Sequence, residues 1–156
     1  MDYPSYFARH YDKYVSHVEF MGAVSDKVLQ QLYQSCDLFV APSVYESFGL
    51  VYLEAMNYAK PVIGCRAGGV PEVVDHGVTG MLVDPEAPTA LADAIVCMFK
   101  TPANLREMGI AGRQQLLTKF TYLQMARNFE QVYRQVIHSF NTGLASSSIA
   151  AGLGEE

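Results

Sequence analysis

The pattern of hydrophobic and polar residues changes near Thr89. Before it, compact apolar runs alternate with segments in which apolar residues recur at helical spacing. The run over residues 37–42 is closed by a proline and predicts a strand buried on both faces, as in a parallel sheet. Shorter runs predict further strands over residues 18–21, 61–64 and 81–83.

The segments between these runs predict helices. Ser25 is a good capping residue, and the positions after it carry apolar residues on one face. From Thr89 onward the chain is expected to be entirely helical, with Thr121 capping the last helix. The expected helices cover residues 5–14, 25–35, 49–58, 72–75, about 89–100, 102–117 and about 122–137.

Alternating strands and helices indicate an α/β fold: a partial Rossmann-like, three-layer α/β/α domain with a short parallel sheet and C-terminal helices. The chain has 156 residues, which suits one domain over residues 1–140. Residues 141–156 are rich in Gly, Ala and Ser, and this composition predicts a flexible tail.

Composition narrows the classes of function. The net charge is −5 without a long basic run, which argues against nucleic-acid or anionic-membrane binding. The cysteines Cys36, Cys65 and Cys97 are odd in number and form no CxxC pair, so we expect reduced thiols in or near the core. With no visible signal peptide or spanning segment, the expected location is the cytoplasm.

The candidate chemistry lies where the strand over residues 37–42 leads into the next helix. Ligands of open α/β sheets bind at this end of the strands, and a helix start offers free N–H groups to a phosphate. Gly49 removes a side chain where a phosphate oxygen would approach the backbone. The junction therefore predicts a pyrophosphate site, although it has neither a GxGxxG fingerprint nor a P-loop.

Two glutamates flank this helix start, Glu46 in the loop and Glu54 inside the helix. Their spacing suits the two ends of an extended ligand such as a nucleotide sugar, with Glu54 accepting from ribose hydroxyls and Glu46 from sugar hydroxyls. In the alternative interpretation, Glu46 caps the first turn of the helix and Glu54 is a solvated surface residue.

The ordered series of motifs resembles the C-terminal domain of family 4 retaining glycosyltransferases, which have the GT-B fold. An E-x7-E pair alone is weak evidence, whereas the series extends over three-quarters of the chain. Its members are Val18-Glu-Phe-Met-Gly22, Cys36-Asp-Leu-Phe-Val-Ala-Pro-Ser43, Glu46-Ser-Phe-Gly-Leu-Val-Tyr-Leu-Glu54, Glu54-Ala-Met56, Pro61-Val-Ile63, Gly68-Gly-Val-Pro-Glu72, Gly77-Val-Thr-Gly-Met-Leu-Val-Asp-Pro85 and Phe120-Thr121.

The resemblance implies a role for each matching position. Glu46 is implied as the catalytic-site glutamate that holds the donor sugar, and Glu54 as the ribose-binding glutamate. The implied sugar and diphosphate contacts are the backbone N–H groups of Phe48, Gly49 and Leu50. The implied nucleobase contacts are Gly22, Ala23 and Val24. The resemblance further implies retention of anomeric configuration, no cofactor and no metal, because the helix start and basic side chains neutralise the leaving diphosphate.

Two departures from the family pattern matter. Ala59 stands where the family has Gly, at a position expected to need positive φ. The strand-helix-strand unit with a phosphate-binding Arg and Lys is not matched, since Arg9, Lys13 and Lys27 do not occupy those positions. We therefore expect an incomplete donor-binding domain that is inactive alone and lacks its N-terminal acceptor domain or partner chain.

The alternative hypothesis is a non-catalytic nucleotide- or sugar-binding module that acts with a partner subunit. A homo-oligomer formed through an exposed sheet edge or the last helix is a further expectation. The remaining features are less specific. The histidines have no metal-ligand spacing, the early tyrosines predict packing rather than a binding surface, and Gly68-Gly69 fits a tight turn as well as an anion site.

Overall fold

A computed structural model describes residues 2–141 of the chain. These residues fall into two compact units, Met1–Cys36 and Asp37–Glu156, and each is described by itself. The predicted tail lies outside the described residues, apart from Asn141 at the end of the last helix. Within residues 2–141, no helix combines the length and apolar character needed to cross a bilayer.

The first unit is helical. Its elements are α1 (Tyr3–His10), the 3₁₀ helix η1 (Asp12–His17) and α2 (Asp26–Ser35). Helix α1 starts earlier than predicted because the Asp2 carboxylate accepts from the Ser5 N–H at 2.8 Å and caps it.

The strand predicted over residues 18–21 is wrong, because this segment forms no strand in the structure. A strand exists only through a hydrogen-bonded neighbour, and the first unit has no other extended run to supply one. The segment instead contributes to a ring cluster, in which Phe20 makes edge-on contacts with Tyr3 and Phe7 at centroid distances of 6.0 and 5.5 Å. The early aromatic residues pack on one another, as the sequence predicted.

The second unit contains the predicted parallel sheet. It has three strands in the order β1 (Phe39–Ala41), β2 (Val62–Cys65) and β3 (Gly80–Val83). All four residues of β2 are buried, as expected of a central strand. The residues of β1 are only half-buried, so the expectation of a strand buried on both faces fails there. The physical reason is that β1 is an outer strand with β2 as its one partner.

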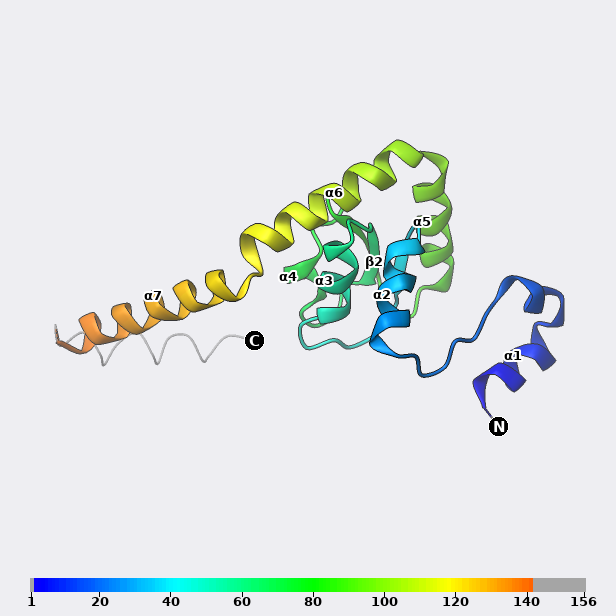
Figure 1. The fold of residues 1–156 in the computed structure, drawn as a ribbon, viewed down its shortest axis with the longest axis horizontal. Coiled ribbons are helices and arrows are strands. Elements are labelled where there is room, and N and C mark those ends of the chain that lie inside the picture. The colour runs from blue at the N-terminus through cyan, green and yellow to red at the C-terminus, as the bar shows by residue number, and fades with distance from the viewer. Residues whose placement is uncertain (1, 142–156) are drawn as a thin grey trace. The chain divides into compact units, whose positions relative to one another are not determined.

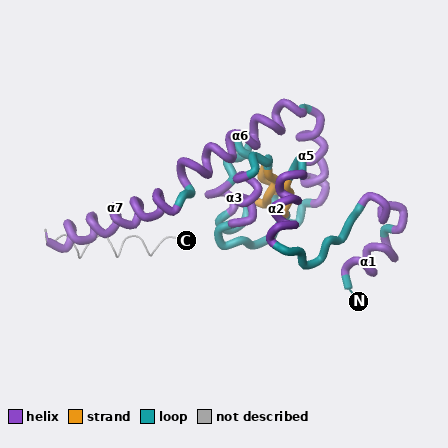
Figure 2. Tube along the Cα trace, in the orientation of Figure 1, coloured by secondary structure: helices purple, strands orange, loops and turns teal. Residues whose placement is uncertain are grey.

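Five helices belong to this unit. In Figures 1 and 2 the last of them extends away from the sheet, and the others lie around the strands. The prediction that Thr121 caps the last helix is confirmed, since its hydroxyl accepts from the Gln124 N–H at 3.2 Å. The helices are α3 (Leu50–Asn57), α4 (Val70–Val73), α5 (Pro88–Lys100), α6 (Pro102–Lys119) and α7 (Tyr122–Asn141).

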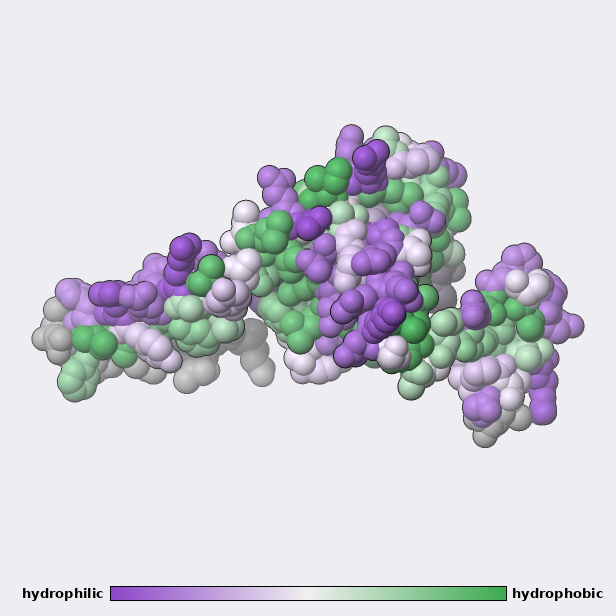
Figure 3. Space-filling view, in the orientation of Figure 1, coloured by the Kyte–Doolittle hydropathy of each residue, from purple (hydrophilic) through white to green (hydrophobic). Residues whose placement is uncertain are grey.

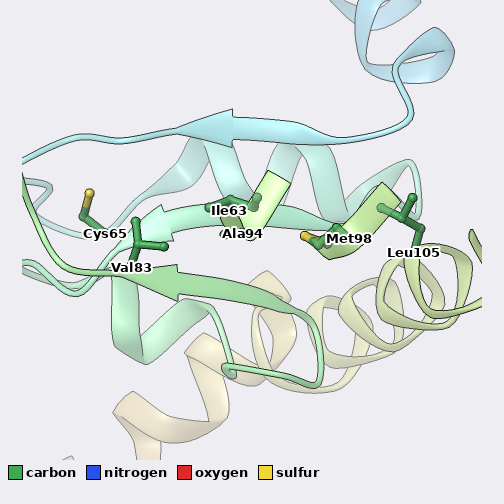
Figure 4. Close-up of a cluster of buried hydrophobic side chains, with 6 residues drawn as sticks. All are labelled: Ile63, Cys65, Val83, Ala94, Met98 and Leu105. Atoms are coloured by element: carbon green, nitrogen blue, oxygen red, sulfur yellow. The ribbon is translucent and has the colours of Figure 1, made fainter. Parts of the chain in front are cut away.

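Helices cover both faces of the sheet. On one face, Ile63 and Cys65 of β2 pack with Ala94 and Met98 of α5 in a buried apolar cluster (Figure 4). On the other face, Gly64 lies under Tyr52 of α3, so the three layers of the predicted fold are present. Cysteine burial matches the prediction only in part, because Cys97 is exposed on α5.

Helix α3 ends in a hydrogen-bonded cap. The N–H of Ala59 donates to Met56 and that of Lys60 to Ala55, the paired bonds of a Schellman motif. Ala59 has φ 55°, the left-handed conformation that the sequence anticipated for this position. The carbonyl of Ala59 faces Gly109 of α6, where a Cβ would come within 2.0 Å of it. The cap therefore also positions α6 against α3.

Candidate functional site

The loop from β1 to α3 leaves the carboxyl end of its strand and turns into the helix at Gly49. Gly49 is buried and has φ 90°, a conformation that L side chains rarely adopt. A Cβ on Gly49 would lie 2.7 Å from the Tyr52 ring, so space as well as conformation requires glycine. Because Gly49 N-caps α3, the N–H groups of Leu50 and Val51 have no intrahelical acceptor. The first turn is thus a donor surface of positive partial charge.

Tyr52 fixes this loop and helix to the sheet. Its ring is fully buried and stands edge-on to Phe39 of β1 at a centroid distance of 5.8 Å. Its hydroxyl donates to the carbonyl of Ala41, the last residue of β1, at 2.6 Å. Burial raises the pKa of Tyr52 to about 12, so the phenol stays protonated and able to donate. The helix start is therefore held rigidly at the end of the strand.

The loop after β2 packs against the loop between β1 and α3. The Gly69 N–H donates to the Glu46 carbonyl at 2.8 Å. A Cβ added to Gly68 would lie 2.1 Å from the carbonyl oxygen of Glu46. A Cβ added to Gly69 would lie 2.4 Å from the carbonyl oxygen of Ser47. Because this N–H is already used, the glycine pair acts here as a close backbone contact that shapes the first loop. This observation favours the tight-turn interpretation over the anion site.

The structure places the two glutamates as their spacing predicted. Glu46 is half-buried in the loop, and its Cγ lies 3.5 Å from the position of a Cβ on Gly49. Glu54 is exposed in the second turn of α3. One carboxylate thus precedes the helix start and the other follows it. The capping and the ligand-gripping interpretations of Glu46 both stay predictions.

Phe48 and Leu50 form the outer wall of the site and are 38% and 64% exposed. They open onto a groove of about 500 Å³ that runs to the start of α7. The Phe48 ring contacts Phe120 edge-on at a centroid distance of 6.0 Å. Lys119, which also makes an ion pair of 3.8 Å with Asp75, contributes a basic side chain. The complete lining is Phe48, Leu50, Leu53, Lys119, Phe120, Thr121, Met125, Asn128, Phe129 and Val132.

Gly22, Ala23 and Val24 belong to the first unit, where they precede α2. Gly22 has φ 60°, so this loop also contains a turn that suits glycine. Their expected contact with a nucleobase stays a prediction. His76 is a turn residue, as expected, and its Nδ1 accepts from the Leu82 N–H at 2.9 Å.

Sequence reasoning missed Tyr52 and Lys119. Tyr52 was assigned only to a helix, although small residues at Gly49 and Gly64 were a signal that a large ring fills the space between them. Lys119 comes from the end of α6, and no local pattern connects it with Phe48.

The geometry joins three features that together define a class: a parallel sheet covered on both faces, a glycine-started helix at the end of β1, and glutamates on either side of that start. A family model for group 1 glycosyl transferases matches residues 2–101. The chain is 40% identical over 114 residues to the alpha-maltose-1-phosphate synthase of Mycolicibacterium smegmatis, which covers 69% of this chain and 30% of the relative.

Solved glycosyltransferase structures resemble this chain in fold. The sucrose-phosphate synthase of Thermosynechococcus elongatus superimposes with a TM-score of 0.74 and 34% identity, over 86% of this chain and 34% of that one. HepE of Anabaena, solved in complex with UDP-glucose, gives a TM-score of 0.69 and 25% identity, over 85% of this chain and 38% of that one.

The chain belongs to the group 1 glycosyl transferase family and has part of the GT-B fold. It spans about a third of the length of the relatives that it matches.

Proposed function

We propose that this chain binds the nucleotide-diphosphate sugar donor of a retaining glycosyltransferase. One observation carries the proposal: α3 begins at a buried left-handed Gly49, beside the end of β1, with Glu46 before the start and Glu54 after it. Family membership and the UDP-glucose bound by HepE support the choice of ligand class. The alternative, a binding module without catalysis, keeps the same ligand and site.

The diphosphate is assigned to the first turn of α3. The N–H groups of Leu50 and Val51 point out of the helix start without an intrahelical acceptor, and the helix dipole favours negative charge there. Gly49 leaves its own backbone open to a phosphate oxygen. These donors neutralise part of the charge that develops on the leaving diphosphate. We expect donor binding to persist in the presence of a chelator.

The carboxylates are assigned to the two ends of the donor. Glu54, one turn past the phosphate site and exposed, accepts from the ribose hydroxyls. Glu46, held close to the helix start by the bond between its carbonyl and Gly69, positions the sugar.

The proposed reaction exchanges one bond at the anomeric carbon. The bond to the diphosphate oxygen breaks, and a bond to the acceptor hydroxyl oxygen forms on the same face of the sugar. The acceptor proton passes to the departing phosphate, and Glu46 stabilises the developing positive charge without attacking it. We expect the acceptor-binding residues and the remaining phosphate contacts on another domain or a partner chain. We therefore propose that the 156-residue chain is inactive alone.

Calorimetric titration with UDP, GDP and ADP tests the binding claim. One diphosphate should bind better than the other two, and Glu54→Ala should weaken that binding about tenfold or more, because a charge-assisted bond to ribose is lost. Glu107→Ala, which removes an exposed carboxylate of α6, is the matched control and should leave the affinity unchanged. Equal weak heats for all three nucleotides, unaffected by Glu54→Ala, would refute the assignment.

A further inference from the structure

Charged residues gather at one end of the sheet. Hydrophobic surface lies over part of α7 and beside its start (Figure 3), whereas the loops that leave the carboxyl ends of the strands carry four charged residues. These loops are residues 42–49 after β1, 66–69 after β2 and 84–87 after β3. Their charged residues are Glu46, Arg66, Asp84 and Glu86. Ligands of open α/β sheets bind at this end of the strands, so the single cation of these loops stands where a ligand is expected.

The backbone of Arg66 is fixed by the sheet. Its N–H donates to the carbonyl of Val83 at 2.8 Å, directly after the last register pair of β2 and β3. The chain then turns tightly, because the N–H of Ala67 donates to the carbonyl of Cys65 at 2.9 Å. The Arg66 side chain therefore starts from a rigid point, and binding a ligand there orders only the side chain itself.

The guanidinium of Arg66 is not used inside the described chain. The side chain is exposed and takes part in neither of the two ion pairs found within residues 2–141. Asp84, which follows Val83 in the chain, is thus no ion-pair partner of Arg66. An arginine in this state keeps its planar fork of N–H donors, which matches two oxygens of a phosphate or a carboxylate.

Arg66 lies on the side of the donor site that is assigned to the sugar. Gly69, in the same loop, donates from its N–H to the carbonyl of Glu46 at 2.8 Å. The chain between Arg66 and Gly68 keeps their Cα atoms within about 7 Å of each other. Glu54, assigned to the ribose, follows the start of α3 inside the helix. An anion bound by Arg66 is therefore beside the transferred sugar and away from the ribose.

The charge balance of the three loops gives Arg66 its importance. Their three carboxylates repel an anionic ligand, and the start of α3 opposes them with the partial charge of neutral N–H groups. Arg66 contributes the one full positive charge of these loops. Without it, they would carry three negative charges and no positive one.

We propose that Arg66 binds an anionic oxygen group, a phosphate or a carboxylate, beside the sugar of the bound donor. The place of the sugar rests on the proposed function, whereas the fixed backbone and unpaired guanidinium of Arg66 do not. Two sources present such a group there: the diphosphate of the donor, or an acidic substituent of the acceptor. In both cases Arg66 makes this end of the sheet selective for an anionic substrate, while Gly68 and Gly69 supply the tight turn.

Titration with inorganic phosphate, followed by NMR at constant ionic strength, tests the site. The Nε–H signal of Arg66 and the backbone N–H signal of Ala67 should shift and saturate. Arg66→Ala should weaken the binding about tenfold or more, because a charge-assisted contact is lost. Arg66→Lys should keep part of the affinity, since it retains the charge without the planar fork.

Arg113→Ala is the matched control, because Arg113 is an exposed arginine of α6, and it should bind phosphate as the wild type does. Circular dichroism confirms that each variant is folded. An unmoved Arg66 signal, or equal affinity in the wild type and Arg66→Ala, overturns the proposal.

A second phosphate titration, with UDP, GDP or ADP already bound, separates the two sources. Phosphate that still binds at Arg66 assigns the residue to the acceptor. Phosphate displaced by the nucleotide, with weaker nucleotide binding in Arg66→Ala, assigns it to the donor diphosphate. A nucleotide that shifts the start of α3 while phosphate leaves Arg66 unmoved refutes this inference and not the donor site. Phosphate bound at Arg66 without binding of any nucleotide refutes the donor site and not the anion site.

Discussion

The hydroxyl of Tyr52 donates to the carbonyl oxygen of Ala41 at 2.6 Å and joins the first turn of α3 to the last residue of β1. This bond lies directly beneath the loop to which the donor is assigned. Because the ring is also wedged between Gly49 and Gly64, its removal should disturb both the stability of the unit and the shape of the loop.

Replacing Tyr52 by Phe tests the bond with little change of volume. The carbonyl of the half-buried Ala41 would lose its side-chain donor, and the free energy of unfolding should fall by about 1–2 kcal/mol. Urea denaturation followed by circular dichroism measures the loss. Tyr45→Phe is the control, because Tyr45 is 76% exposed, and it should change stability by less than about 0.5 kcal/mol. Equal effects for the two variants would contradict a structural role for the bond.

The same residue predicts a pH dependence. Burial raises the pKa of Tyr52 to about 12 from an ordinary value of 10.0. Between these values the unfolded chain releases a proton that the folded chain keeps, so stability is fully present below pH 10 and declines as the pH rises towards 12. The decline should be on the order of 2 kcal/mol.

Tyr52→Phe identifies the source of this decline. The chain contains nine other tyrosines, which remain in the variant. Stability measured against pH in the alkaline range should therefore fall less steeply in Tyr52→Phe than in the wild type. Parallel curves would show that Tyr52 does not cause the decline.

Ala59 predicts a stabilising substitution. With φ 55° it occupies a left-handed position at the end of α3, where a side chain is strained and glycine is not. Ala59→Gly should raise the free energy of unfolding by a few tenths to about 1 kcal/mol. Ala103→Gly, at an exposed position in the first turn of α6, should change it in the opposite direction. Thermal denaturation of both variants measures the two changes in stability. A loss of stability in Ala59→Gly would contradict the inferred backbone strain at Ala59.

The glycine pair after β2 predicts a coupling between two loops. An added Cβ on Gly68 would come 2.1 Å from the Glu46 carbonyl oxygen, so Gly68→Ala must move one loop or the other. We expect a loss of about 2–3 kcal/mol in stability and weaker nucleotide binding.

Gly77→Ala provides the control for this coupling. Gly77 also has a positive φ, of 78°, but an added Cβ there would meet nothing within 4 Å. The control should therefore show only the cost of backbone strain, about 1 kcal/mol, with unchanged binding. Equal losses in the two variants would mean that contact between the loops does not matter.

The sequence predicted the elements that have a strong local signal. The central strand, the helix after Gly49 and the capping by Thr121 follow from apolar runs and from single residues whose chemistry is unambiguous. The segment over residues 18–21 failed because a strand depends on a partner elsewhere, which no local pattern reveals.

The candidate site divides in the same way. Glu46, Gly49 and Glu54 lie within one contiguous motif, and their positions before, at and after the start of α3 were predictable from the spacing. Tyr52 and Lys119 were not found, because their importance comes from contacts with residues distant in the sequence. Close backbone approach between Gly68 and Glu46 likewise exists only in three dimensions.

Amide chemical-shift mapping with a nucleotide-diphosphate sugar tests the central claim most directly. The backbone N–H signals of Phe48, Gly49 and Leu50 should shift most as the donor is added, because the diphosphate is assigned to these donors at the start of α3. Signals of the opposite end of the sheet, around Lys60, should not move. Shifts confined to other parts of the chain, with the α3 start unchanged at saturation, would contradict the donor site proposed for this protein.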